Sequence, residues 1–229
     1  MKKAEMKNKT VFAMMHHGIL EHYQGQSVFF PEYLIDDFGN VSTELADLGL
    51  KIVFTGHYHA QDIVKKTTDT ANFIYDIETG SLVTYPSPYR FADLDDDILS
   101  ITSKVVTEID YDIGGYSDFQ EYAFAFIQSG LHDIIVYMLI SGAISAGGYQ
   151  IILSYDDAFM VAPFLTAAFI AHYAGDELPD AQTIAVIQML MTDTDPGKQI
   201  LGSALAGLWT DLQPADNNVV IDLMSGETL

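Results

Sequence analysis

The chain has 229 residues, of which 49% are hydrophobic, and it carries a formal net charge of −22. This length allows one large domain or two small ones, and the hydrophobic content excludes wholesale disorder. So negative a charge disfavours binding to nucleic acid or to an anionic membrane surface, and the lack of cysteine excludes disulfides and thiolate metal sites.

The charge is unevenly distributed and indicates two regions. Residues 1–104 carry 15 acidic and 9 basic side chains, whereas residues 105–229 carry 17 acidic side chains and a single basic one, Lys198. We predict an α/β domain over residues 1–92, a linker or strand over 93–115, and an acidic, mainly helical module over 116–229.

The first region has the pattern of a strand–helix–strand unit. An apolar run predicts a strand over residues 10–16, and Pro31 and Gly39 frame a short helix. A second short helix is expected from Ser42 or Thr43 to Gly49, followed by a strand over residues 50–56. Strands joined in this way pair in parallel.

Further elements follow in chain order. Residues 72–85 predict a hairpin turning at Glu78-Thr79-Gly80, and residues 100–113 alternate like a strand. Residues 118–211 have helical spacing, with helix starts at Asp180 and Asp195, and the final residues from 219 predict a strand and turn.

One stretch, Ile134 to Tyr155, has no charged residue and is long enough to span a bilayer. Acidic residues flank it and no Lys or Arg lies nearby to orient it, so we expect a buried helix pair or a helix–turn–strand. We expect a soluble protein, in the cytoplasm or the periplasm.

Two histidine clusters follow the two predicted strands. His16 and His17 come after the first strand, and His57 and His59 come after the second, in the sequence GHYH. Parallel strands bring such ends to one edge of a sheet, and Gly56 allows a sharp turn there. Neutral imidazole suits Zn²⁺, Mn²⁺ or Fe ions, so these residues predict a metal site, the alternative being structural histidines.

The segments MMHHG and GHYHAQD resemble the last two sequence blocks of the calcineurin-like metallophosphoesterases. The resemblance covers roughly residues 10–92, including GSLVTYPSPYR, which resembles the segment that follows in bacterial members. It implies the second half of a four-layer β-sandwich with two divalent metal ions (Mn, Zn or Fe) and a phosphomonoester or phosphodiester as substrate.

The resemblance also implies individual roles. His16 and His57 would bind one metal ion, His59 would bind the other, and His17 would line the cleft as a candidate catalytic residue. Arg90 could contact a substrate phosphate. The alternative for Arg90 is a surface salt bridge with Asp93 or Asp95.

The sequence departs from the family pattern in its missing carboxylate blocks. The motifs Asp-x-His, Gly-Asp-x-x-Asp and Gly-Asn-His-Glu/Asp do not occur in it. Three imidazoles suffice for one zinc ion, but they cannot form the two-metal site. We therefore expect weak metal binding, little or no hydrolysis by this chain alone, and either an upstream half or self-association as a partner.

Two further features have simpler interpretations. The acidic run at Asp93 and residues 95–97 lacks the spacing of a calcium loop, so we expect a solvated linker. The aromatic and methionine residues of the helical region predict core packing, with a ligand groove as the alternative. They are Phe124, Phe126, Phe159, Phe164, Phe169, Met189 and Met191.

Together these observations predict the C-terminal part of a bacterial-type, metal-dependent phosphoester hydrolase. The alternative is a non-enzymatic scaffold or interaction protein built on a degenerate phosphoesterase half. Metal affinity separates the two, because a scaffold does not need the histidines to converge.

Overall fold

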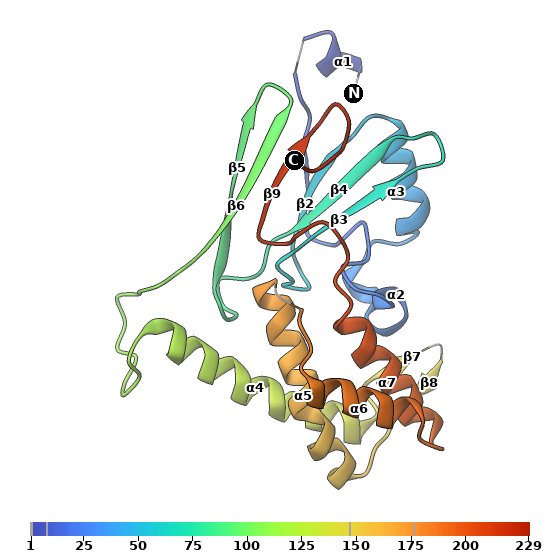
Figure 1. Ribbon diagram of the computed structural model, residues 1–229, viewed down its shortest axis with the longest axis vertical. Helices are drawn as coiled ribbons and strands as arrows, with labels where there is room; N and C mark the ends of the chain where they lie inside the picture. Colours follow the sequence, from blue (N-terminus) through green and yellow to red (C-terminus); the bar gives the residue numbers. More distant parts are fainter. Residues whose placement is uncertain (1, 8, 147, 176) are drawn as a thin grey trace.

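A computed structural model describes residues 2–7, 9–146, 148–175 and 177–229. The chain forms a mixed α/β fold with two main sheets and a group of helices below them (Figure 1). Its helices are α1 (Lys2–Glu5), α2 (Gln26–Phe29), a 3₁₀ turn (Pro31–Tyr33), α3 (Phe38–Asp47), α4 (Phe119–Ser141), α5 (Tyr155–Ala174), α6 (Ala181–Met191) and α7 (Pro196–Leu208). Its strands are β1 (Ala13–Met14), β2 (Ile52–Thr55), β3 (Asp62–Thr67), β4 (Phe73–Glu78), β5 (Pro88–Asp95), β6 (Ile98–Val105), β7 (Ser145–Ala146), β8 (Tyr149–Gln150) and β9 (Asn218–Asp222).

The first sheet has the strand order β1-β2-β4-β3. Strands β1, β2 and β4 are parallel, with Ala13 opposite Val53 and Val53 opposite Asp76, while β3 is antiparallel to β4. The parallel pairing of the two predicted strands is therefore present. It places the segments after β1 and β2, which contain the histidines, at one edge of the sheet.

Side chains alternate along each strand, so each strand contributes residues to both faces of the sheet. Both faces are covered by other elements. On one face Val53 and Ile74 pack with Ala46 of α3. On the other face Ile52 and Tyr75 pack against the second sheet, which has the order β5-β6-β9. The layers are thus helix, sheet and sheet, and the core lies on both sides of β2 and β4.

The helical region forms its own core beneath the sheets. Helices α4, α5, α6 and α7 bury Leu139, Leu165, Leu190 and Leu205, among others. The predicted starts at Asp180 and Asp195 are confirmed, since each carboxylate accepts a hydrogen bond from a backbone N–H of the first turn.

The predicted hairpin over residues 72–85 is wrong. Strand β4 ends at Glu78, and residues 81–87 form turns in which Leu82 and Val83 are exposed. The hairpin partner of β4 is β3, which precedes it. The run Leu82 to Tyr85 resembles a strand in composition, but it has no strand to pair with among the described residues.

The predicted helix boundaries before β2 also differ. A single helix, α3, begins at Phe38, so Ser42 and Thr43 lie inside it and their hydroxyls donate to the carbonyl of Gly39 rather than capping. Side-chain bonds of this kind inside a helix satisfy the hydroxyl without ending the helix. The predicted end at Gly49 is confirmed by its positive φ of 89°.

The predicted domain limits need two corrections. Strand β5 runs through the limit at residue 92 and pairs with β6, so the strand alternative holds for residues 93–95 and 98–105, with a turn at Asp96 and Asp97. The C-terminal strand β9 leaves the helical module and pairs with β6, placing Leu99 opposite Ile221. The α/β region is therefore made from both ends of the described chain.

Most of the aromatic and methionine residues predicted for the helical core are on the surface instead. Phe164 and Phe169 pack on that core. The others are exposed by 38–66%: Phe124, Phe126, Phe159, Met189 and Met191. The helices are apolar on their outer faces as well, so spacing alone could not identify the buried face.

Two helices, α4 and α5, are long and apolar enough to cross a membrane by length and composition. Half of the apolar window of α5 is buried in the molecule, as expected of a core helix, compared with 11% for α4. The uncharged stretch from Ile134 continues past α4 into the short strands β7 and β8, so the predicted order of helix and strand is present. The predicted burial is wrong for this part of α4, where Ile134 is 55% and Tyr137 65% exposed.

Candidate functional site

The two histidine clusters meet at the carboxyl ends of β1 and β2. The ring of His57 lies 4.3 Å from that of His16 and 4.4 Å from that of His17, measured between ring centres. The rings of His16 and His17 are 5.4 Å apart. Backbone hydrogen bonds hold the two loops together, since the N–H of Gly56 donates to the carbonyl of His16 at 3.1 Å.

The backbone of the second cluster has an uncommon conformation. His57 and His59 have φ angles of 74° and 67°, in the left-handed region that disfavours side chains other than glycine. Such residues persist only where the surrounding structure holds them, and they gather at functional sites. Here the turn brings the ring of His57 to those of His16 and His17, whereas the ring of His59 lies 6.4 Å from that of Tyr173.

The electrostatic environment favours the neutral form of His57 and His59. Burial, and then the neighbouring charges of His16 and His17, lower the pKa of His57. Burial, and then His16, lower the pKa of His59. Neutral imidazole is the form that binds metal ions.

The imidazole rings suit a metal ion in their chemistry and in the spacing of their centres, but not in their orientation. Two imidazoles on one zinc ion, with Zn–N distances of about 2.0–2.1 Å, hold their ring centres roughly 4.5–5.5 Å apart. The observed separations lie in or close to that range. Even so, within the described ranges no three His, Cys, Asp or Glu side chains have a geometry that would hold a metal ion. The rings pack against one another, and they would have to turn about their side-chain bonds to face one point.

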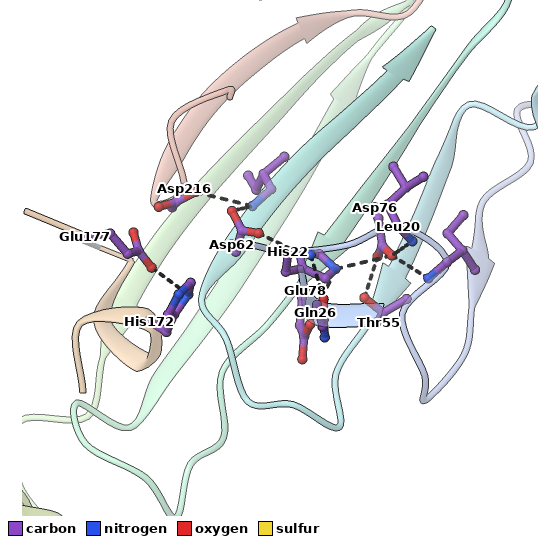
Figure 2. A network of polar contacts seen from close by, with 12 residues as sticks. Leu20, His22, Gln26, Thr55, Asp62, Asp76, Glu78, His172, Glu177 and Asp216 are labelled. Atoms are coloured by element: carbon purple, nitrogen blue, oxygen red, sulfur yellow. Dashed lines mark hydrogen bonds and ion pairs between the residues drawn. The ribbon is translucent and has the colours of Figure 1, made fainter. Parts of the chain in front are cut away.

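A buried polar network lies behind the histidine loops and was missed from the sequence. His22 is fully buried, and its Nδ1 lies 2.7 Å from Asp62 (Figure 2). Its Nε2 lies 3.3 Å from Asp76 and 3.4 Å from Glu78. His22 belongs to neither of the two histidine clusters in the sequence. The available signal was the pair of acids inside the apolar strand FIYDIE.

This network fixes the loop that carries His16 and His17. Asp76 accepts hydrogen bonds from the backbone N–H groups of Ile19 and Leu20, at 2.7 and 3.1 Å, and from the hydroxyl of Thr55 at 2.5 Å. The loop after β1 is thus bonded to β4 and to the end of β2. Through these bonds the two histidine-bearing segments are held in register.

The pKa values in the network follow from burial and pairing. Burial alone would lower the pKa of His22, but the charges of Asp76 and Glu78 raise it well above the usual value. Burial, opposed in part by His22, raises the pKa of Glu78 to about 8. Burial alone would raise the pKa of Asp62, but its hydrogen bond to His22 lowers it. Within this network the pKa of Glu78 is thus raised while that of Asp62 is lowered, on either side of His22.

Arg90 does not form the surface salt bridge that was the alternative considered for it. Its guanidinium donates to the backbone carbonyl of Asp216 at 2.7 Å and to that of Glu78 at 3.0 Å. Burial lowers its pKa to about 10, so it remains charged at neutral pH. Arg90 thus ties β4 and β5 to the segment that leads into β9, and within the described residues no ion pair joins it to Asp93 or Asp95.

The other two histidines of the chain, His132 and His172, have different surroundings. His172 of α5 is buried, with Nδ1 2.9 Å from a carboxylate oxygen of Glu177, and its ring packs against Tyr23. His132 is close to the surface of α4 beside Asp133. His172 is next to the loop of the second cluster, because its ring centre lies 6.3 Å from that of Tyr58 and its carbonyl accepts a hydrogen bond from the N–H of Gln61 at 2.8 Å.

Comparison with known proteins adds no assignment. No family model matches the chain, and no curated protein matches it significantly.

Proposed function

We propose that the histidine cluster is part of a metal-dependent phosphoester hydrolase site, in the second half of a calcineurin-like phosphoesterase sandwich. The observation that carries this proposal is the convergence of His16, His17 and His57 at the ends of two parallel strands, with ring centres 4.3–5.4 Å apart. The left-handed backbone at His57 and His59 supports it further.

In this proposal His16 and His57 hold one divalent ion, His59 is a further candidate ligand on the same loop as His57, and His17 lines the substrate side. A bound ion would polarise a phosphoryl oxygen of the ester. The buried network of His22, Asp76 and Glu78 acts through position alone, by holding the loop after β1 against β2 and β4.

Zinc and manganese titration calorimetry tests this proposal. We expect micromolar binding by the wild-type chain and a loss of at least about tenfold in a His57→Ala, His59→Ala double variant. His132→Ala is the matched control, because this histidine lies away from the cluster, and it should leave binding unchanged. Equal, weak binding by all three proteins would mean that the acidic surface collects the ions, and the proposal would fall.

The sequence lacks the carboxylate motifs of the family, and this leads to a prediction about hydrolysis. Purified chain supplied with manganese should turn over p-nitrophenyl phosphate poorly or not at all, because three imidazoles cannot form a two-metal site. Rapid turnover that is lost in the double variant would contradict this expectation of an incomplete site.

The alternative function, a non-enzymatic interaction protein, is favoured by a separate observation. Helix α4 exposes large apolar side chains along its length, with Phe126 66%, Ile134 55% and Tyr137 65% exposed. Such a surface is typical of a contact with another macromolecule. If the chain is an interaction protein, the titration should detect no metal binding at the histidines. A partner macromolecule should still bind through the apolar surface of α4.

A further inference from the structure

An apolar cavity of about 230 Å³ adjoins the histidine cluster on the side of the helical module. Its walls come from three helices that are distant in sequence: Leu131 and Ile135 of α4, Leu165 and Phe169 of α5, and Leu201 and Leu208 of α7. Figure 1 shows these helices gathered beneath the sheet edge at which β2 ends. The helical module therefore builds one side of the same site that the strands supply with histidines.

The polar groups of this cavity are at one end. His57 and His59 line it together with Tyr58, and the ring of Tyr33 lies 4.8 Å from that of His57. The hydroxyl of Tyr58 is buried and has no hydrogen-bond partner within the described part of the chain. No Asp, Glu, Lys or Arg is among the described residues that line the cavity. The cavity is thus apolar along its length and polar where it meets the histidines.

An open space of this kind is not an ordinary packing defect. Protein interiors are close-packed and contain few voids larger than a water molecule. A dry apolar cavity of about 150 Å³ is enough to bind benzene, and the present cavity is larger. Binding sites for small molecules have this composition, with apolar walls and a few polar groups at one place.

We propose that this cavity receives the apolar part of an amphiphilic phosphoester, such as an alkyl or aryl phosphate, with the phosphate at the histidines. The inference rests on the proposed function for the phosphate end, whereas the apolar end depends only on the helices. It gives the helical module a role in substrate choice: short polar phosphates leave the cavity empty and bind more weakly.

The apolar end can be tested without metal. Octanol binding is followed by calorimetry and by the fluorescence of Trp209, the sole tryptophan, which packs on the core of the helical module. We expect saturable binding by the wild-type chain and a loss of about tenfold or more when Ala204→Phe fills the cavity. Ser203→Phe, on the exposed side of the same helix, is the control and should bind octanol as wild type does.

A second cavity-filling variant controls for a loss of octanol binding that is caused by misfolding of the first. Met138→Trp fills the cavity from α4, and circular dichroism checks that both filling variants keep the wild-type helix content. Absence of octanol binding in the wild type, or unchanged binding in both folded filling variants, would overturn the proposal.

The polar end is tested with manganese present. Octyl phosphate, phenyl phosphate and inorganic phosphate are compared below the micelle concentration. We expect octyl or phenyl phosphate to bind at least about tenfold more tightly than inorganic phosphate, and the preference over octanol to vanish in the His57→Ala, His59→Ala double variant. The ester that binds more tightly, octyl or phenyl phosphate, identifies the preferred apolar group as alkyl or aryl.

The failures of the two proposals are distinguishable. Octanol and octyl phosphate binding equally well would overturn the phosphoester assignment while the cavity itself remains a site for apolar groups. Metal binding that depends on the histidines, together with no preference for apolar phosphates, would overturn the substrate inference and leave the proposed metal site in place.

Discussion

His22 shows how a single buried residue can connect several elements. It lies in the loop after β1 and reaches the first residue of β3 and two acids of β4. A buried charge is tolerated only where partners are close, and breaking such a set by removing one partner is strongly destabilising. The network therefore fixes the loop that carries His16 and His17, and it also makes the free energy of unfolding depend on pH.

The sign of that dependence follows from Glu78. Its pKa is about 8 in the folded chain against an ordinary value of 4.5, so the folded state holds an extra proton between those pH values. Stability contributed by this group therefore falls as the pH rises from about 4.5 to about 8. His22 acts in the same direction, because its pKa is raised, so its stabilisation is present below 6.5 and lost as the pH rises through its folded pKa.

Glu78→Gln tests this expectation, since glutamine keeps a neutral side chain in the same place. We predict that the free energy of unfolding of the variant falls less steeply with pH, by up to about 1.4 kcal/mol per pH unit. Urea unfolding at several pH values between about 4.5 and 8 measures the slope. Glu108→Gln, at an exposed position, is the control and should have the wild-type slope. Parallel curves for all three proteins would show that Glu78 is ionised when folded.

At the scale of elements, α7 is fixed against the loop before α2 by a close approach at Gly207. A Cβ atom added there would lie 2.1 Å from the carbonyl oxygen of Gln24. The contact leaves no space for a side chain, so α7 lies directly on the backbone of the α/β region. Gly130, inside α4, differs in having nothing within 4 Å of an added Cβ.

These two glycines form a matched pair of variants. We expect Gly207→Ala to destabilise the chain by about 1–3 kcal/mol, because the helix or the loop must shift. Gly130→Ala should instead stabilise it by about 0.5–1 kcal/mol, because alanine loses less conformational freedom in a helix. Thermal and urea unfolding of both variants measure the difference. Two variants of equal stability would show that α7 is free to move away from the loop.

At the scale of the whole molecule the excess of negative charge is the dominant feature. The formal net charge is −22, and among the described residues the ion pairs of lysine involve only Lys65 and Lys198. A net charge far from zero destabilises a compact state through self-repulsion, and salt screens this repulsion. The helical region carries most of it, with a single basic residue after position 104.

Salt should therefore stabilise this protein. We predict that raising sodium chloride from about 20 mM to about 500 mM increases the melting temperature by roughly 2–5 °C. Circular dichroism at the helix band follows the transition, and an uncharged osmolyte at matched osmolarity separates screening from general exclusion. A melting temperature that falls or stays constant would mean that local pairing outweighs the net repulsion.

Some features of the fold were predictable because they depend on neighbours in sequence. The strand–helix–strand unit, the helix end at Gly49 and the starts at Asp180 and Asp195 rest on apolar periodicity, capping and backbone preference, which act within a few residues. The placement of histidines after two parallel strands followed from the same local reasoning. From the order of the two motifs we expected the two histidine clusters to lie close together.

Tertiary structure decided the features that need distant segments. The C-terminal strand β9 pairs with β6, and His22 pairs with acids of β3 and β4, because each can satisfy its hydrogen bonds or bury its side chain only there. Likewise the cavity at His57 exists because three helices converge on one strand end. The sequence by itself determined which residues can serve as imidazole ligands, while folding decided which of them share a site, because convergence is set by packing between segments far apart in the chain.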